Sequence, residues 1–241
     1  MFYRYSTPVG GFISVLLYVA VGAVYCHKAN LSVGDNNQIE QETLSRYGKE
    51  FTWDIKRAQM GRTHNDAIRV LLDMTGLTSL VSVVEYAQVY DQILHSLFPD
   101  APLLPGAEKI IRHLHAHKIP IAICTGSSAT TFGLKTTKHK DLVNLFHHVV
   151  TIGTEPEIKL GKPAPDCFLV CAARFNPVSA DPGEILVFED APNGVEAALA
   201  AGMQVVMVPD PRVGQEHRDK ATSCLESLEQ FKPELFGLPP F

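Results

Sequence analysis

Three short polar stretches, each next to an apolar run, carry residue types that could bind a phosphate group and a metal ion. Residues 125–128 (TGSS) supply a hydroxyl and backbone amides directly before a helical pattern, an arrangement that cradles anions. Glu189 and Asp190 follow another apolar run, and adjacent carboxylates suit a hard cation such as Mg²⁺. Lys162 stands between a glycine and a proline, so the loop would present its positive charge at a fixed position.

Each stretch also has an ordinary structural interpretation. Thr-Gly-Ser turns are common, Asp190 could be the N-cap of the helix that follows it, and Lys162 could be a solvated loop lysine. The three stretches occur in order, and each lies where a strand pattern meets a helix pattern. Together they indicate one site more specifically than any of them does alone.

The elements that must position this site alternate between strand and helix from residue 104 onwards. Strands separated by helices require parallel pairing with right-handed crossovers, and hence a doubly wound sheet. In such sheets ligands bind beyond the carboxyl ends of the strands, where we expect the three stretches to converge. The predicted strands are 119–125, 146–152, 184–188 and 204–208, and the predicted helices are 105–118, 163–175 and 192–201.

A different pattern precedes this region. Residues 31–37 (LSVGDNN) form a turn-rich break, after which residues 38–47, 63–74 and 80–97 carry apolar residues at helical spacing. No strand pattern interrupts them. We therefore expect a small helical bundle of about 60 residues.

Composition excludes several other classes of protein. The chain has 241 residues, of which 46% are hydrophobic, so it can bury a sizeable core. Its net charge of −5, with no basic stripe, argues against nucleic acid as a partner. The five cysteines match no zinc-module spacing, and a reducing compartment is the expected environment.

The three stretches, taken with their flanking residues, resemble motifs two, three and four of the haloacid dehalogenase superfamily. Those motifs correspond here to residues 125–127, 161–166 (GKPAPD) and 188–194 (FEDAPNG). The closer resemblance is to the pseudouridine 5′-phosphatases and their insect-type relatives, through residues 104–108, 187–209 and 231–239. It implies an α/β fold, with a doubly wound, mainly parallel Rossmann-like core at 104–241, an inserted helical cap at 38–103 and a cytoplasmic location.

The resemblance also implies a reaction. In this superfamily an Asp at the end of the first strand attacks phosphorus, and a second Asp two residues later acts as acid and base. Mg²⁺ neutralises charge in the transition state, and the substrate would be a small nucleotide-type monophosphate. Carried over to this chain, Thr125 and Gly126 would hold phosphate oxygens, Lys162 would offset charge, Glu189 and Asp190 would bind Mg²⁺, and Arg62 in the cap would reach a second group of the substrate.

Motif one is where the sequence departs from this pattern. Its Asp-x-Asp-Gly signature should fall at residues 24–28, which read Val-Tyr-Cys-His-Lys, and the only acidic residue before Glu40 is Asp35. Removing the nucleophile of a hydrolase costs on the order of 10⁶ in turnover. We therefore expect this chain to be inactive as written, although its remaining carboxylates could still bind Mg²⁺.

The N-terminal segment, residues 1–37, admits three interpretations. Phe12–Cys26 (FISVLLYVAVGAVYC) contains no charge, yet it is shorter than the about 20 residues that a membrane span needs. It also fits the apolar region of a signal peptide, or a buried parallel strand. Hydropathy alone does not choose among a membrane, a secretory and a core role.

Three hypotheses follow for the function. The chain is a phosphatase whose first exon, with Asp-x-Asp-Gly, is missing from this sequence; or a non-catalytic isoform that binds a small phosphorylated metabolite or a protein partner; or a form tethered to a membrane through Phe12–Cys26. The sequence does not indicate an oligomeric state.

Overall fold

The computed structural model describes residues 36–59, 64–179 and 181–241. Arg62 and Phe12–Cys26, both singled out in the sequence, lie outside the described residues. The chain divides into two compact units, with the boundary between Asp100 and Ala101. This boundary lies three residues before the one predicted from the sequence, because Ala101 and Leu103 pack into the core of the second unit.

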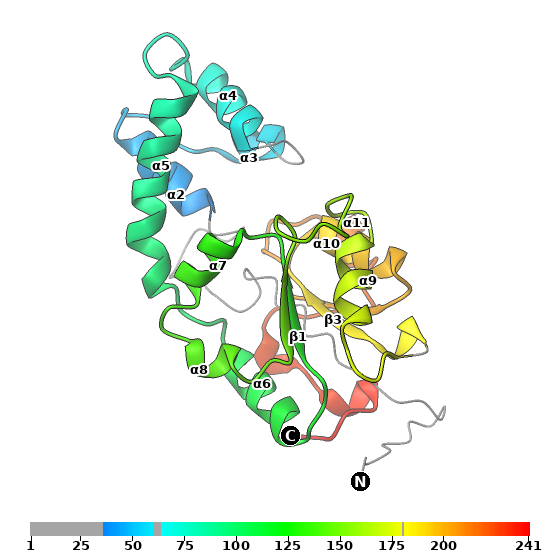
Figure 1. Cartoon of the computed structure of the whole chain (residues 1–241). Coiled ribbons are helices and arrows are strands. Elements are labelled where there is room, and N and C mark those ends of the chain that lie inside the picture. The colour runs from blue at the N-terminus through cyan, green and yellow to red at the C-terminus, as the bar shows by residue number, and fades with distance from the viewer. Residues whose placement is uncertain (1–35, 60–63, 180) are drawn as a thin grey trace. The chain divides into compact units, whose positions relative to one another are not determined.

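The first unit is the helical bundle. Its helix α5 begins with a capping box, in which the Ser82 hydroxyl accepts the Glu85 amide and the Glu85 carboxylate accepts the Ser82 amide. Helix α2 packs against α5, and α3 packs against α4 (Figure 1). The helices are α2 (Asn36–Ser45), α3 (Trp53–Gln59), α4 (His64–Thr75) and α5 (Val83–Leu97), followed by the 3₁₀ turn η1 (Phe98–Asp100).

A buried carboxyl group links three helices of this unit. The Tyr86 hydroxyl donates to one oxygen of Glu40 at 2.7 Å, and the Gln59 amide donates to the other at 3.2 Å. Burial raises the pKa of Glu40 above its ordinary value of 4.5, and these two hydrogen bonds offset part of that rise. A carboxyl with a higher pKa in the folded chain favours folding below its unfolded pKa, and that contribution is lost as the pH rises through the folded pKa.

We therefore expect the unfolding free energy of the helical unit to fall as the pH is raised from 4.5 through the folded pKa of Glu40. Trp53, the single tryptophan of the chain, lies in α3 and reports this unit in urea titrations followed by fluorescence. Glu40→Gln cannot ionise and should lose this component of the pH dependence. An unchanged pH profile in Glu40→Gln would assign the effect to another group.

The second unit contains short parallel strands and the helices that connect them. Strand β1 (Ala122–Thr125) pairs with β2 (His148–Thr151), while β3 (Leu186–Glu189) pairs with β4 (Gln204–Met207), and β4 with β5 (Ser223–Cys224). All of these pairs are parallel, in agreement with the doubly wound α/β class predicted from the sequence. The helices are α6 (Ala107–Ala116), α7 (Ala129–Lys135), α8 (Lys140–Val143), α9 (Asp166–Ala173), α10 (Pro192–Ala200) and α11 (Gln215–Arg218).

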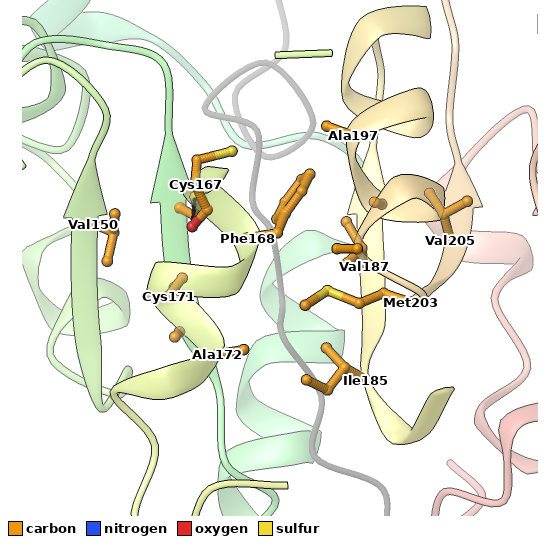
Figure 2. Close-up of a cluster of buried hydrophobic side chains, with 14 of the residues drawn as sticks. Val150, Cys167, Phe168, Cys171, Ala172, Ile185, Val187, Ala197, Met203 and Val205 are labelled. Carbon is orange, nitrogen blue, oxygen red and sulfur yellow. Dashed lines mark hydrogen bonds between the residues drawn. The ribbon is translucent and has the colours of Figure 1, made fainter. Parts of the chain in front are cut away.

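Two apolar clusters cover opposite faces of these strands. On one face, α6 packs with Ile123 of β1 and Phe188 of β3. On the other, α9 and α10 pack with Cys124 of β1. Val187 of β3 belongs to the same cluster (Figure 2). Successive residues of a strand point to opposite faces, so both β1 and β3 lie in a single layer between the same two groups of helices.

Two contacts between buried thiols and backbone carbonyl groups fix the direction of α9 relative to β1. Cys167, at the start of α9, accepts a hydrogen bond on its carbonyl from the Cys124 thiol at 3.3 Å. One turn later the Cys171 thiol lies 3.7 Å from the carbonyl oxygen of Ile123, the residue before Cys124. Helix α9 therefore runs antiparallel to β1, as expected for a crossover helix in a parallel sheet.

Among the described helices, none is long and apolar enough to cross a membrane. The longest of those in the bundle, α5, has 15 residues, whereas a span of the hydrocarbon core takes about 20.

Candidate phosphate and metal site

The turn after β1 places a hydroxyl and a backbone amide at the end of the strand. Thr125 is buried, and its hydroxyl oxygen accepts the Ser127 amide at 3.1 Å, so the hydroxyl keeps its own proton to donate. Gly126, the next residue, is exposed. Ser128 then caps α7 by accepting the Thr131 amide at 3.1 Å. The predicted strand–turn–helix arrangement of residues 125–128 is confirmed.

The carboxylate of Glu189 at the end of β3 is fully engaged within the protein. The residue is 1% exposed. One oxygen accepts the backbone amides of Asp190 and Ala191, both at 2.8 Å, and the other accepts the Lys162 ammonium at 2.5 Å. Glu189 therefore holds the turn and the lysine, and direct metal binding would have to compete with Lys162.

Asp190 is half-buried and follows Glu189 at the same edge. The N-cap of α10 is Ala191, and no side chain caps this helix. The interpretation of Asp190 as a helix N-cap is therefore wrong, because the helix begins one residue later than that role requires. Asp190 is instead the carboxylate that the fold places next to the Lys162–Glu189 ion pair.

Lys162 is buried in its loop, with its side chain only 9% exposed. In addition to Glu189, its ammonium lies 5.1 Å from the centroid of the Phe168 ring. The carboxylate of Asp166 holds the loop by accepting the amides of Lys159 and Leu160 at 3.1 and 3.0 Å. The alternative of a solvated loop lysine is wrong, because the loop folds back onto β3.

Gly194 allows the first turn of α10 to approach this ion pair. A Cβ at this position would lie 1.8 Å from one Glu189 carboxylate oxygen and 2.0 Å from its carboxyl carbon. Only glycine can therefore occupy this place without moving Glu189. Sequence reasoning quoted Gly194 within a motif but gave it no role. The signal was present, since glycine is unfavourable within a helix and needs a packing reason there.

The strand ends meet at one edge of the α/β unit. Lys162 precedes α9 and contacts Glu189 at the carboxyl end of β3, while Cys167 at the start of α9 contacts Cys124 near the carboxyl end of β1. Thr125, Lys162, Glu189 and Asp190 therefore share this edge, as predicted. Arg62, the cap residue predicted to contact the substrate, lies outside the described residues.

An aspartate–arginine pair extends the same edge beyond β4 and was missed in the sequence. The Asp210 side chain is 4% exposed and accepts the Arg212 backbone amide at 2.7 Å and its guanidinium Nε at 3.0 Å. Strands β3 and β4 are in parallel register here, since the Val208 amide donates to the Glu189 carbonyl at 2.8 Å. The sequence signal for Asp210 was an acidic residue directly after an apolar run, as at Glu189.

The described residues fit a Mg²⁺ ion that is bound jointly with a phosphate. Nowhere in the described ranges do three His, Cys, Asp or Glu side chains gather in a way that could hold a metal ion. Mg²⁺ often uses one or two carboxylates and completes its octahedron with phosphate oxygens and water. Asp190 could supply one such carboxylate, and the turn at Thr125 and Gly126 could supply donors to the phosphate.

The sequence of this chain is similar to those of known hydrolases and phosphatases. The model of the haloacid dehalogenase-like hydrolases matches residues 18–202. The chain is 46% identical over 204 residues to (DL)-glycerol-3-phosphatase 2 of Arabidopsis thaliana, covering 85% of each chain. It is 48% identical over 198 residues to a probable pseudouridine-5′-phosphatase of Drosophila melanogaster, covering 82% of this chain and 84% of that one.

Solved structures share the fold at lower identity. A haloacid dehalogenase family hydrolase from Deinococcus radiodurans, with bound phosphate and sodium, superposes with a TM-score of 0.73 at 22% identity, over 96% of this chain and 99% of that one. CbbY from Rhodobacter sphaeroides, in complex with phosphate, superposes with a TM-score of 0.69 at 16% identity, over 91% and 96% of the two chains.

Proposed function

Because the chain belongs to the haloacid dehalogenase-like hydrolase family, we propose that its sheet edge binds the phosphate group of a small metabolite together with Mg²⁺. The observation that carries this proposal is the buried Lys162–Glu189 ion pair beside Asp190. Burying a charged pair is costly, and buried charges held by a specific partner are typical of functional sites. Here it holds an ammonium group at the edge where the sheet can receive an anion.

Each residue of this edge has a proposed role toward the phosphate. The Thr125 hydroxyl and the Gly126 amide donate to phosphate oxygens, and Lys162 offsets their negative charge. Asp190 holds Mg²⁺, with Glu189 behind it fixing the turn and the lysine. When bound, Mg²⁺ neutralises charge on the phosphoryl group. We further propose that Arg62 of the cap reaches a second anionic or hydroxyl group of the ligand.

The class of ligand is inferred from the compounds for which the similar proteins are named. Two proteins of comparable similarity to this chain are named for glycerol 3-phosphate and for pseudouridine 5′-phosphate. Both compounds are small monophosphates with a pair of free hydroxyl groups. We propose this class for the present chain, with pseudouridine 5′-phosphate as the first probe and glycerol 3-phosphate as the second.

The proposed function of this chain is binding without turnover. An aspartyl-phosphate cannot form where the sequence has no carboxylate pair ahead of the cap, since Asp35 stands alone before Glu40. The residues that bind phosphate and Mg²⁺ come from other strands and are retained. Loss of catalysis and retention of binding are therefore compatible in this chain.

We expect calorimetry to detect Mg²⁺ binding that strengthens when inorganic phosphate is present, and to find it weakened at least about tenfold in Asp190→Asn. Asp219→Asn is the matched control, because Asp219 is exposed and lies in the turn after α11. With Mg²⁺, neither pseudouridine 5′-phosphate nor glycerol 3-phosphate should be hydrolysed above background. Robust turnover that Asp190→Ala abolishes would contradict binding without catalysis and would require another nucleophile.

A further inference from the structure

An arginine side chain is held in a fixed orientation at the edge of the α/β unit that carries the candidate site. Arg212 lies in the turn that follows β4, the strand paired with β3. The Glu189 carbonyl at the end of β3 accepts the Val208 amide at 2.8 Å, so the two strands stay paired up to the start of this turn. The turn therefore begins about one strand spacing, ~4.8 Å, from the backbone that carries Asp190.

A buried carboxylate orients the guanidinium group of Arg212. The Asp210 side chain, which is 4% exposed, accepts Nε of Arg212 on Oδ1 at 3.0 Å and Nη2 on Oδ2 at 3.3 Å. Two bonds to one carboxylate fix the plane of a guanidinium as well as its position. The Arg212 side chain is nevertheless 42% exposed. The ion pair therefore extends from the interior to the surface, with its positive member on the outside.

The turn is closed by bonds that do not involve the guanidinium of Arg212. Arg218 of α11 donates from Nε to the Val213 carbonyl at 2.8 Å and from Nη2 to the Asp210 carbonyl at 2.9 Å. The Asp210 carboxylate accepts the Arg212 backbone amide at 2.7 Å, and the Asp210 carbonyl accepts the Val213 amide at 3.0 Å. None of these bonds needs a particular side chain at position 212. The orientation of the Arg212 guanidinium is thus additional to what the turn requires.

We propose that Arg212 is a specificity-determining residue, which donates to an oxygen of the ligand outside its phosphate group. This inference rests on the proposed function, because it takes the phosphate to lie at Thr125, Lys162 and Asp190. Lys162 contacts the end of β3 and Asp190 follows it, whereas Arg212 follows β4, the next strand of the sheet. A guanidinium presents its N–H donors in a rigid fork, so it can select an acceptor by position. Asp210 is the positioning residue that holds this fork.

The chemistry of the proposed ligands separates this contact from phosphate binding. Glycerol 3-phosphate and pseudouridine 5′-phosphate both carry two hydroxyl groups outside the phosphate, and inorganic phosphate carries none. A contact between Arg212 and the organic part of a ligand therefore changes the affinity for the organic phosphates alone. A purely structural contribution of Arg212 changes the affinity for all three ligands alike, or for none of them.

Calorimetry in the presence of Mg²⁺ tests the proposal with pseudouridine 5′-phosphate and inorganic phosphate. Arg212→Gln should weaken the binding of pseudouridine 5′-phosphate at least about tenfold and leave the affinity for inorganic phosphate within about twofold of wild type. Arg212→Lys keeps the charge without the fork and should recover only part of the loss. Asp210→Asn should cause a smaller loss of the same kind. Lys220→Met, at an exposed lysine just after α11, is the matched control and should change neither affinity.

Each other outcome overturns the inference in a recognisable way. An equal loss of affinity for both ligands in Arg212→Gln would place the guanidinium on the phosphate, and no loss for either would remove it from the site. If Arg212→Gln does not fold, the same comparison is made with Arg212→Lys. A wild-type chain that binds inorganic phosphate as tightly as both organic phosphates would overturn this inference alone. A wild-type chain that binds none of the three would overturn the proposed function as well.

Discussion

Replacing residues 1–37 by an apolar strand that ends in Asp-x-Asp-Gly, followed by a linker of the family's length, is expected to create a Mg²⁺-dependent phosphatase. Removal of a nucleophile costs on the order of 10⁶ in turnover, so its restoration should raise activity by several orders of magnitude above the parent chain. The measurement is phosphate release from pseudouridine 5′-phosphate and glycerol 3-phosphate, with and without Mg²⁺.

The physical reason is that the partners of such a strand are already in place. Thr125 ends β1 with a hydroxyl that can donate, Lys162 is held against Glu189, and Asp190 follows at the same edge. A new strand needs only to bring the missing carboxylates to this edge.

Two controls make the result interpretable. A chimera with Asn-x-Asn-Gly in place of Asp-x-Asp-Gly should fold equally well and stay inactive, and Asp190→Asn in the active chimera should remove the Mg²⁺ dependence together with the activity. A folded chimera that binds Mg²⁺ yet stays inactive would show that the remaining core has diverged from a catalytic arrangement.

Lys162→Met is expected to lower the unfolding free energy of the α/β unit by about 3–5 kcal/mol, the usual effect of removing one partner of a buried ion pair. The variant leaves the Glu189 carboxylate, which is 1% exposed, with two backbone donors and without the one cation that contacts it among the described residues. Urea unfolding followed by far-ultraviolet circular dichroism measures the change.

The double variant Lys162→Met/Glu189→Gln should recover at least half of that loss, because no buried charge remains without its partner. Lys159→Met is the matched control: it lies in the same loop and is exposed, so its effect should stay within about 0.5 kcal/mol. If Lys162→Met is no more destabilising than Lys159→Met, the ion pair does not contribute to stability.

Most of the fold could be predicted from sequence patterns because the strands are continuous apolar runs and the longer helices carry apolar residues at helical spacing. The run before Thr125 and the run before Glu189 read as buried strands and form β1 and β3. Element ends were less accurate: α6 spans Ala107–Ala116 where residues 105–118 were expected. Strand β5 was missed, since two residues carry no periodicity.

The candidate site could be assembled from the sequence as a set of residues but not as a set of contacts. The order of the polar stretches grouped Thr125, Lys162 and Asp190 as candidates. Both carboxylate oxygens of Glu189 are engaged because of how α10 approaches β3. This is a tertiary contact, and local sequence patterns do not predict it. The pairing of Asp210 with Arg212 was missed for a related reason, because it depends on how the loop after β4 turns back on itself.

The cysteines of the α/β unit differ in solvent exposure, so their rates of alkylation can report local opening of this unit. Cys124, Cys167 and Cys171 are sealed between α9 and the strands, whereas Cys224 in β5 is exposed. An alkylating reagent should therefore modify Cys224 at once and reach the other three only when α9 separates from β1. The rate at which mass is gained at those three positions would then measure how often this half of the molecule opens, with no spectroscopic signal required.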